Sequence, residues 1–352
     1  MLTEMTWWLA AGVGLACGSA ALLILFAVWH RVVGTGSLRP RKLRDGRRAT
    51  VLAGDSGVDL IYKEIFEERS YFRHGVTLPK NDNKKETNGT PPLILDVGAN
   101  IGFFAASCAE DMPRYEIHCV EPIPVLALAA RRNTTALNID ADRSIRVHEI
   151  GLAAEEQAGT SVSFNFNPGT SVGSTMFKSE ISAAGWRHGP CTWVAALLHD
   201  YAWAGQLPKQ PTGVVCALLQ VPIVKYGVLL LFLPLAYVLI LYQLASPSAR
   251  REVCSQLTTL PALLRREGLH GRDIDMVKVD VEGAEWLVLQ GIDDGTWARI
   301  RQLVVEVHNI DGRVNKVAQL LRDKGFANVV VGTEHMEILK LLDLATVFAT
   351  RE

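Results

Sequence analysis

The chain has 352 residues, which allows one large domain or two modest ones. Its formal net charge of −1 gives no basis for bulk electrostatic binding to nucleic acid, so no nucleic-acid partner is expected. Hydrophobic residues make up 49% of the chain, and they are concentrated in two stretches. The six cysteines lack Cys-x-x-Cys or Cys/His metal spacing, so we interpret them as packed thiols and predict no metal site.

The first apolar stretch covers residues 5–33, and its core at 6–29 carries no charge. A helix of this length can cross a hydrocarbon layer of roughly 30 Å at about 1.5 Å per residue. A cleaved signal peptide is the alternative, but Glu4 stands where such peptides carry positive charge. Residues 1–33 therefore predict an uncleaved membrane anchor. The arginine-rich residues that follow predict that the rest of the chain is cytosolic, unless they form a basic linker without topological meaning.

Residues 34–92 are expected to form a basic linker and an N-terminal extension. The part at 34–50 is rich in glycine and arginine, which favours a linker beside the membrane. Residues 51–78 mix apolar and charged positions, as in a short hairpin or a helix that covers the edge of a domain. Residues 80–92 are polar and turn-rich, so we expect an exposed loop there.

Strands and helices then alternate along the chain. Short apolar runs predict strands at 93–97, 116–120, 145–150, 162–166, 275–279, 302–307, 328–331 and 344–349. Helices are predicted at 101–111, 125–137, 285–291 and 314–324. This alternation predicts an α/β fold with a doubly wound, Rossmann-like sheet. Its ligand crevice would lie at the carboxyl ends of the strands.

The second apolar stretch, at 214–245, interrupts this pattern inside an insertion that we place at 187–250. Its hydropathy is that of a transmembrane helix. A single crossing, however, would put the earlier and later strands on opposite sides of the membrane, where they could not share one sheet. We therefore predict a membrane-embedded re-entrant hairpin or an interfacial element. The alternatives are an apolar lid folded on the domain, or a true crossing with the sheet interpretation wrong.

A turn rich in small residues follows the first strand of the sheet. Asp96 lies near the end of that strand, and Gly98, Ala99, Asn100 and Gly102 follow it. Such a turn lets backbone N–H groups and a helix N-terminus approach a ligand. It departs from the Gly-x-Gly-x-x-Gly pattern of dinucleotide sites, which disfavours a nicotinamide-dependent oxidoreductase. Glu121, followed by Pro122, ends the second strand, where a carboxylate can accept hydrogen bonds from two ribose hydroxyls.

Several motifs occur together in a specific order: Asp96-Val-Gly-Ala-Asn-Ile-Gly-Phe, Val120-Glu-Pro, Val277-Lys-Val-Asp-Val-Glu-Gly-Ala-Glu and Glu306-Val-His. In this the chain resembles the FkbM family of S-adenosylmethionine-dependent methyltransferases over roughly residues 93–180 and 255–349. The resemblance implies a class I methyltransferase domain at 93–349, S-adenosylmethionine as cofactor, and O-methylation of hydroxyls, often on sugars or natural products. The implied cofactor-binding residues are Asp96, Gly98, Ala99, Asn100, Gly102, Glu121 and Pro122, with Glu121 on the ribose.

Acidic residues beside this site are the candidates for catalysis. Asp280 and Glu282 cap a strand near the presumed donor, and either carboxylate could take a proton from an acceptor hydroxyl. Asp280 could instead cap the helix that follows, and Lys278 could pair with one of the two acids. His308 on the neighbouring strand is a third candidate, as a base or an acceptor contact. These three residues could hold a divalent metal, but the ligand set is too weak to predict one. The polar loop at 171–176 could close over the site.

The two apolar stretches set this chain apart from the family. They predict a membrane-associated O-methyltransferase that binds the lipid bilayer and acts on a lipid-linked or membrane-partitioned hydroxyl. An inert membrane scaffold with the same fold is the alternative function. Two glycosylation sequons, at Asn88 and Asn133, would invert the predicted cytosolic topology if either carried a glycan.

Overall fold

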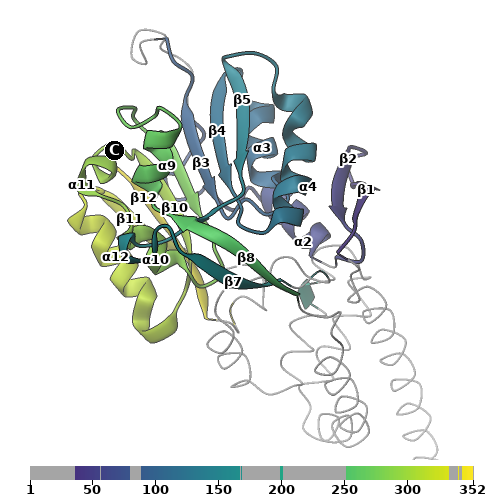
Figure 1. The fold of residues 1–352 in the computed structure, drawn as a ribbon. Helices are drawn as coiled ribbons and strands as arrows, with labels where there is room; N and C mark the ends of the chain where they lie inside the picture. The colour runs from purple at the N-terminus through teal and green to yellow at the C-terminus, as the bar shows by residue number, and fades with distance from the viewer. Residues whose placement is uncertain are drawn as a thin grey trace, which may run out of the picture.

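A seven-stranded mixed sheet forms the centre of the molecule (Figure 1). The computed structural model describes residues 36–55, 57–79, 89–166, 168, 199–200, 251–332, 340 and 343–351. The strands are β3 (Leu93–Val97), β4 (Tyr115–Val120), β5 (Arg143–His148), β9 (Met276–Val279), β10 (Gln302–His308), β11 (Asn328–Gly332) and β12 (Leu344–Thr350). Their order is β11-β12-β10-β9-β3-β4-β5, and β12 runs antiparallel to both of its neighbours. This is the strand order of class I methyltransferases, so the predicted fold class is confirmed.

Helices cover both faces of the sheet, and the strands are buried on both sides for that reason. All five residues of β3 are buried, and they alternate between two cores. Ile94 packs into the core beneath α3 (Phe103–Asp111) and α4 (Pro124–Thr134). Leu93 and Leu95 pack into the core beneath α9 (Leu260–Arg266), α10 (Glu285–Gln290) and α12 (Arg313–Asp323). The short helix α11 (Asp294–Trp297) adds Trp297 to the second core.

The N-terminal extension is folded onto the domain, which corrects the expected linker at 34–50. Strands β1 (Leu38–Lys42) and β2 (Arg48–Leu52) pair as an antiparallel hairpin, and α2 (Val58–Tyr62) continues into a π-helical turn, η1 (Lys63–Glu67). Val51, Leu52 and Ile65 are buried in the core shared with α3.

Part of the basic cluster behind the predicted topology is neutralised within the domain. Nη2 of Arg41 lies 2.6 Å from Oδ2 of Asp59, and Nη1 of Arg44 lies 3.7 Å from Oε1 of Glu67. Arg47 also pairs with an acid, Glu110. Exposed pairs of this kind add little stability. The positive-inside tendency counts Lys and Arg rather than net charge, so these pairs leave the predicted topology as it was.

A second, three-stranded sheet contains the described strands on either side of residues 167–250. Its strands are β6 (Gly151–Leu152), β7 (Ser161–Phe166) and β8 (Arg251–Thr258), in the order β6-β8-β7. Phe166 at the end of β7 pairs with Arg251 at the start of β8. The chain between them, 167–250, therefore starts and ends at neighbouring points of one strand pair (Figure 1).

The predicted membrane segments fall outside the described residues. Within the part of the chain that the structure describes, no helix is both long and apolar enough to cross a bilayer. The anchor at 1–33, the apolar run at 214–245 and the loop at 171–176 are not among those residues. These three interpretations, and the insertion bounds of 187–250, stay predictions.

The sequon at Asn133 is a structural side chain of the fold. Its Nδ2 donates to the carbonyls of Thr50 and Ile101, at 3.0 and 2.8 Å, and its Oδ1 accepts from the N–H of Thr50. Asn133 thus joins α4 to β2 and to the turn before α3. A glycan on Nδ2 would break these contacts, so this sequon gives no support for an inverted topology. Asn88 lies outside the described residues.

Candidate active site

The turn between β3 and α3 packs closely against the backbone of Asp280. Gly98 has a φ of +81°, and a Cβ atom on it would lie 1.6 Å from the Asp280 carbonyl oxygen. No side chain fits there. The N–H groups of Gly98 and Ala99 donate to the Val120 carbonyl, at 2.9 and 3.1 Å, which ties the turn to the end of β4. Asn100 continues the turn with a φ of +50°.

Glu121 joins this turn to the end of β4. One carboxylate oxygen accepts the N–H of Asn100 at 2.8 Å, and the other accepts the N–H of Ile123 at 2.9 Å. Each oxygen has a second lone pair that can accept a further donor. Burial raises the pKa of Glu121 to about 7, although the two backbone donors oppose this shift. The residue can therefore gain or lose its charge near neutral pH.

A pocket with about 930 Å³ of empty space, its mouth included, opens beside the turn. Residues from five parts of the chain line it: the N-terminal extension, the turn with the start of α3, the end of β4 with the start of α4, strands β6 and β7, and the end of β9 with the residues that follow it. Its polar lining residues are Glu64, Tyr71, Asn100, Glu121, Lys278, Asp280 and Glu282. Apolar side chains such as Phe103, Leu126 and Phe164 form much of the remaining wall.

Lys278 connects the donor turn to the candidate base. Its Nζ lies 3.3 Å from Oδ1 of Asp96 and 3.2 Å from Oδ2 of Asp280, and it donates to the Gly98 carbonyl at 2.9 Å. Burial alone would lower the pKa of Lys278, but the charges of Asp280 and Asp96 outweigh burial and raise it. Lys278 is therefore a permanent cation, as the predicted pairing with an acid requires.

Tyr71 is a pocket residue that the sequence did not indicate. Its hydroxyl donates to Oδ2 of Asp280 at 3.1 Å, and its ring lies 5.3 Å from Nζ of Lys278. Burial raises the pKa of Tyr71 well above its usual value, and the charge of Asp280 adds to the shift, so the phenol stays a donor. Asp280 itself is not a helix cap, because Ala284 occupies the N-cap position of α10 and no side chain caps this helix.

A second polar chain runs from Glu282, in the pocket lining, to His308, which does not line the pocket. Glu282 has a φ of +51°, and its Oε2 lies 3.6 Å from Nε2 of His308. Nδ1 of His308 lies 3.2 Å from the fully buried carboxylate of Glu285, which Arg313 approaches to 3.9 Å. Burial, followed by the charges of Asp280 and Glu285, raises the pKa of Glu282 well above its usual value.

The structure separates the predicted site residues into two groups. Seven of them line the pocket: Gly98, Ala99, Asn100, Glu121, Pro122, Asp280 and Glu282. Asp96, Gly102 and His308 do not. Asp96 is fully buried beneath the turn, where it meets Lys278. A Cβ on Gly102 would lie 3.1 Å from Ala130 of α4, so this glycine lets two helices pack rather than lining the pocket.

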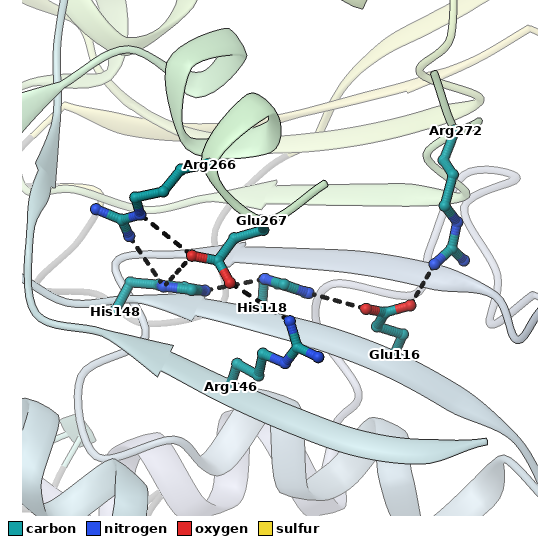
Figure 2. A network of polar contacts seen from close by, with 7 residues as sticks. All are labelled: Glu116, His118, Arg146, His148, Arg266, Glu267 and Arg272. Carbon is teal, nitrogen blue, oxygen red and sulfur yellow. Dashed lines mark hydrogen bonds and ion pairs between the residues drawn. The ribbon is translucent and has the colours of Figure 1, made fainter. Parts of the chain in front are cut away.

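One group of ligand-type side chains has metal-site spacing among the described residues, and it lies away from the pocket lining (Figure 2). It consists of His118, His148 and Glu267. Arginine can only donate, so the 3.2 Å contact from Arg266 makes Nδ1 of His148 an acceptor. Nε2 of His148 then donates to Nδ1 of His118 at 2.9 Å, and Nε2 of His118 donates to Glu116 at 3.3 Å. All four ring nitrogens are used within the protein, which favours a structural network over a metal site.

Comparison with known proteins identifies the family. The chain is 31% identical over 272 residues to methyltransferase sdnD of Sordaria araneosa, and this alignment covers 76% of this chain and 81% of that protein. It is 28% identical over 288 residues to the 31-O-demethyl-FK506 methyltransferase FkbM of Streptomyces tacrolimicus, which covers 82% of this chain and 89% of that protein. Residues 243–327 match the methyltransferase FkbM domain. The chain belongs to the FkbM methyltransferase family.

Membership of this family makes the protein a methyltransferase whose donor is S-adenosylmethionine. Among solved structures, an S-adenosylmethionine-dependent methyltransferase from Agrobacterium tumefaciens is similar at 8% identity and a TM-score of 0.37. The alignment covers 90% of this chain and 70% of the other chain. The fold class therefore rests on the strand order itself. The pocket fits the donor because Glu121, in its lining, offers acceptor oxygens to a ribose. The individual contacts to the donor stay predictions.

Proposed function

We propose that this methyltransferase transfers the donor methyl group to the oxygen of a hydroxyl, with Asp280 accepting the hydroxyl proton. The observation that carries the proposal is the placement of Asp280, which lines the pocket beside the donor turn and is held by Lys278 and Tyr71. The name of the Streptomyces tacrolimicus relative, a 31-O-demethyl-FK506 methyltransferase, supports oxygen as the methylated atom.

The geometry around Asp280 suits a fixed proton acceptor. Both contacts, from Nζ of Lys278 and from the Tyr71 hydroxyl, fall on Oδ2. This arrangement leaves Oδ1 as the oxygen that can face an acceptor hydroxyl. When bound, S-adenosylmethionine supplies an electrophilic methyl group on a cationic sulfur. The hydroxyl oxygen forms the new C–O bond as the C–S bond breaks, the proton passes to Asp280, and S-adenosylhomocysteine leaves. Such a displacement needs mainly alignment and a base, and both are within the reach of these residues.

We further propose that the acceptor is lipid-linked or partitions into the membrane. The apolar stretches at 5–33 and 214–245 support this proposal from the sequence. The pairing of Phe166 with Arg251 adds support, because a segment that starts and ends at one strand pair can enter a membrane and return.

The test is to incubate the full-length protein with methyl-labelled donor and host membranes, then to separate labelled lipid, glycan and protein. Label in the lipid or lipid-linked fraction, lost in Asp280→Asn, is the expected result. Label found only in soluble small molecules would remove the membrane acceptor. Label in an amine rather than an ether or ester would remove O-methylation.

A further inference from the structure

A buried histidine at the end of β10 lies between two carboxyl groups. Nδ1 of His308 lies 3.2 Å from Oε1 of Glu285, and its Nε2 lies 3.6 Å from Oε2 of Glu282. The side chain of Glu285 is fully buried, whereas Glu282 belongs to the pocket lining. His308 therefore connects the lining of the pocket to a carboxyl group inside the protein, although it does not line the pocket itself.

The contacts of Glu285 favour its ionised form. Its Oε1 accepts the N–H of Gly283 at 2.5 Å, and Nη1 of Arg313 lies 3.9 Å from its Oε2. The same Nη1 donates to the Gly283 carbonyl at 2.8 Å, which holds the guanidinium beside the carboxylate. A backbone donor and a cation both stabilise a charged carboxylate, and a charged carboxylate can only accept. In neutral His308 the ring hydrogen is therefore on Nδ1, and the lone pair of Nε2 faces Glu282.

A lone pair on Nε2 favours a proton on the carboxyl group that faces it, because two acceptors would otherwise face each other. Asp280 adds to this preference, since two neighbouring carboxylates do not both ionise readily. Burial, followed by the charges of Asp280 and Glu285, raises the pKa of Glu282 well above its usual value. Of the other charged groups that act on Glu282, Glu64 strengthens this shift and Lys278 opposes it.

The backbone and the spacing at Glu282 are those of a functional residue. Its φ of +51° lies in the left-handed region, which residues with a side chain rarely adopt. Such conformations persist where the surroundings hold them, and they cluster at active sites. The 3.6 Å between Oε2 and the histidine Nε2 exceeds the length of a formed hydrogen bond. Hydrogen bonds in active sites are often this long until the substrate binds.

From this geometry we infer that His308 is a positioning residue, which accepts a hydrogen bond from neutral Glu282 and so leaves Asp280 as the charged carboxylate that takes the hydroxyl proton. The inference rests on the proposed O-methyltransferase function and assigns different protonation states to its two acids. Lys278 and Tyr71 both contact Oδ2 of Asp280 as donors, which favours its ionised form. His308 does the reverse for Glu282, because a hydrogen bond from the protonated carboxyl group favours the neutral form. Surroundings that favour opposite states of two titratable groups are what separates acid and base roles in active sites.

Nuclear magnetic resonance of the full-length protein with isotope-labelled histidine tests the inference without an acceptor. The signals of His308 are assigned by their loss in the variant His308→Asn. Near neutral pH we expect a neutral ring with its hydrogen on Nδ1. A hydrogen on Nε2, alone or together with one on Nδ1, would overturn the inference.

The pH dependence of methyl transfer tests the consequence for the reaction. In His308→Asn the new amide can still donate to Glu285 but has no counterpart of Nε2. Glu282 then loses its proton more readily, and its charge opposes the ionisation of Asp280. With labelled donor and host membranes, we expect the acidic limb of the rate profile to move up by about one pH unit, which is about tenfold in rate on that limb. The double variant His308→Asn/Glu282→Gln should regain the wild-type limb, because glutamine stays neutral.

The same substitution at His270, which is exposed and does not line the pocket, is the matched control and should leave the profile unchanged. A purely structural role of His308 predicts a lower rate at every pH and no recovery in the double variant. Either result, or an unmoved limb in His308→Asn, counts against the inference. Wild-type protein that transfers no methyl group would overturn the proposed function instead, and the resonance measurement would still decide where the ring hydrogen lies.

Discussion

Replacing Lys278 by methionine tests the ion-pair network beneath the donor turn. Nζ of Lys278 has three N–H donors and three partners. It lies 3.3 Å from Oδ1 of Asp96, 3.2 Å from Oδ2 of Asp280 and 2.9 Å from the carbonyl oxygen of Gly98. Methionine keeps much of the side-chain volume but removes the charge, so the fully buried Asp96 loses its cation. Stranding one partner of a buried ion pair costs about 3–5 kcal/mol. That is a large part of the roughly 5–15 kcal/mol that stabilises a domain.

Urea denaturation of wild type, Lys278→Met and the double variant Asp96→Asn/Lys278→Met measures this coupling. The double variant removes the stranded carboxylate, and Asp280, whose side chain is 22% exposed, can be hydrated instead. We therefore expect the double variant to regain most of the lost free energy of unfolding and to come within about 1–2 kcal/mol of wild type. A loss below about 1 kcal/mol in Lys278→Met, or a double variant no more stable than the single one, would refute the reasoning.

Three further predictions follow from the site and from the histidine network. Burial raises the pKa of Glu121 to about 7, and ribose hydroxyls donate best to its ionised form, so donor affinity should fall up to about tenfold per pH unit below 7. Calorimetric titrations should show this fall in wild type and its absence in Glu121→Gln; a flat wild-type profile argues against the ribose contact. Tyr71→Phe keeps the ring and removes the bond to Asp280, so turnover should drop about tenfold with donor affinity unchanged. Loss of donor binding, or an equal drop in Tyr62→Phe outside the pocket, would point to a folding defect instead. Burial and the charge of the neighbouring imidazole lower the pKa of His148 from 6.5 to about 4, so the unfolded chain binds more protons between these values. The contribution of neutral His148 to the free energy of unfolding should be complete above pH 6.5 and should fall by about 3 kcal/mol toward pH 4. Thermal unfolding across this range should show the loss, and His148→Gln should flatten it; an equally steep loss in that variant counts against this assignment.

Most of the sheet could be predicted from local sequence pattern. The apolar run at β3 is short and buried on both faces, as expected when helices cover both faces of a sheet, and β3 has the predicted bounds. Lys278 alternates with Val277 and Val279 on β9, and its predicted pairing with Asp280 or Glu282 is confirmed for Asp280. The β8 strand was not predicted as a strand, because its polar sequence gives no clear apolar alternation and it directly follows the insertion.

The parts of the site that the sequence did not indicate depend on contacts between distant segments. Tyr71 and Asp280 are 209 residues apart, so no motif spacing could connect them. Gly102 looked like a cofactor residue because it belongs to the glycine-rich turn, but its contact with Ala130 comes from the packing of α3 on α4. The part of the β1–β2 hairpin before residue 51 was expected to be a linker, because its basic residues show no apolar alternation. Val51 and Leu52 lie in the next stretch, where a short hairpin or a helix was expected.

The role of Asp280 as proton acceptor is the central claim, and it is tested most directly by the methyl-transfer rate of Asp280→Asn, measured with labelled donor and host membranes. Asparagine is nearly isosteric but cannot take the proton. We expect donor affinity within about twofold of wild type and a rate lower by about 10²- to 10⁴-fold. An Asp280→Asn variant that binds the donor and transfers the methyl group at the wild-type rate would contradict the claim.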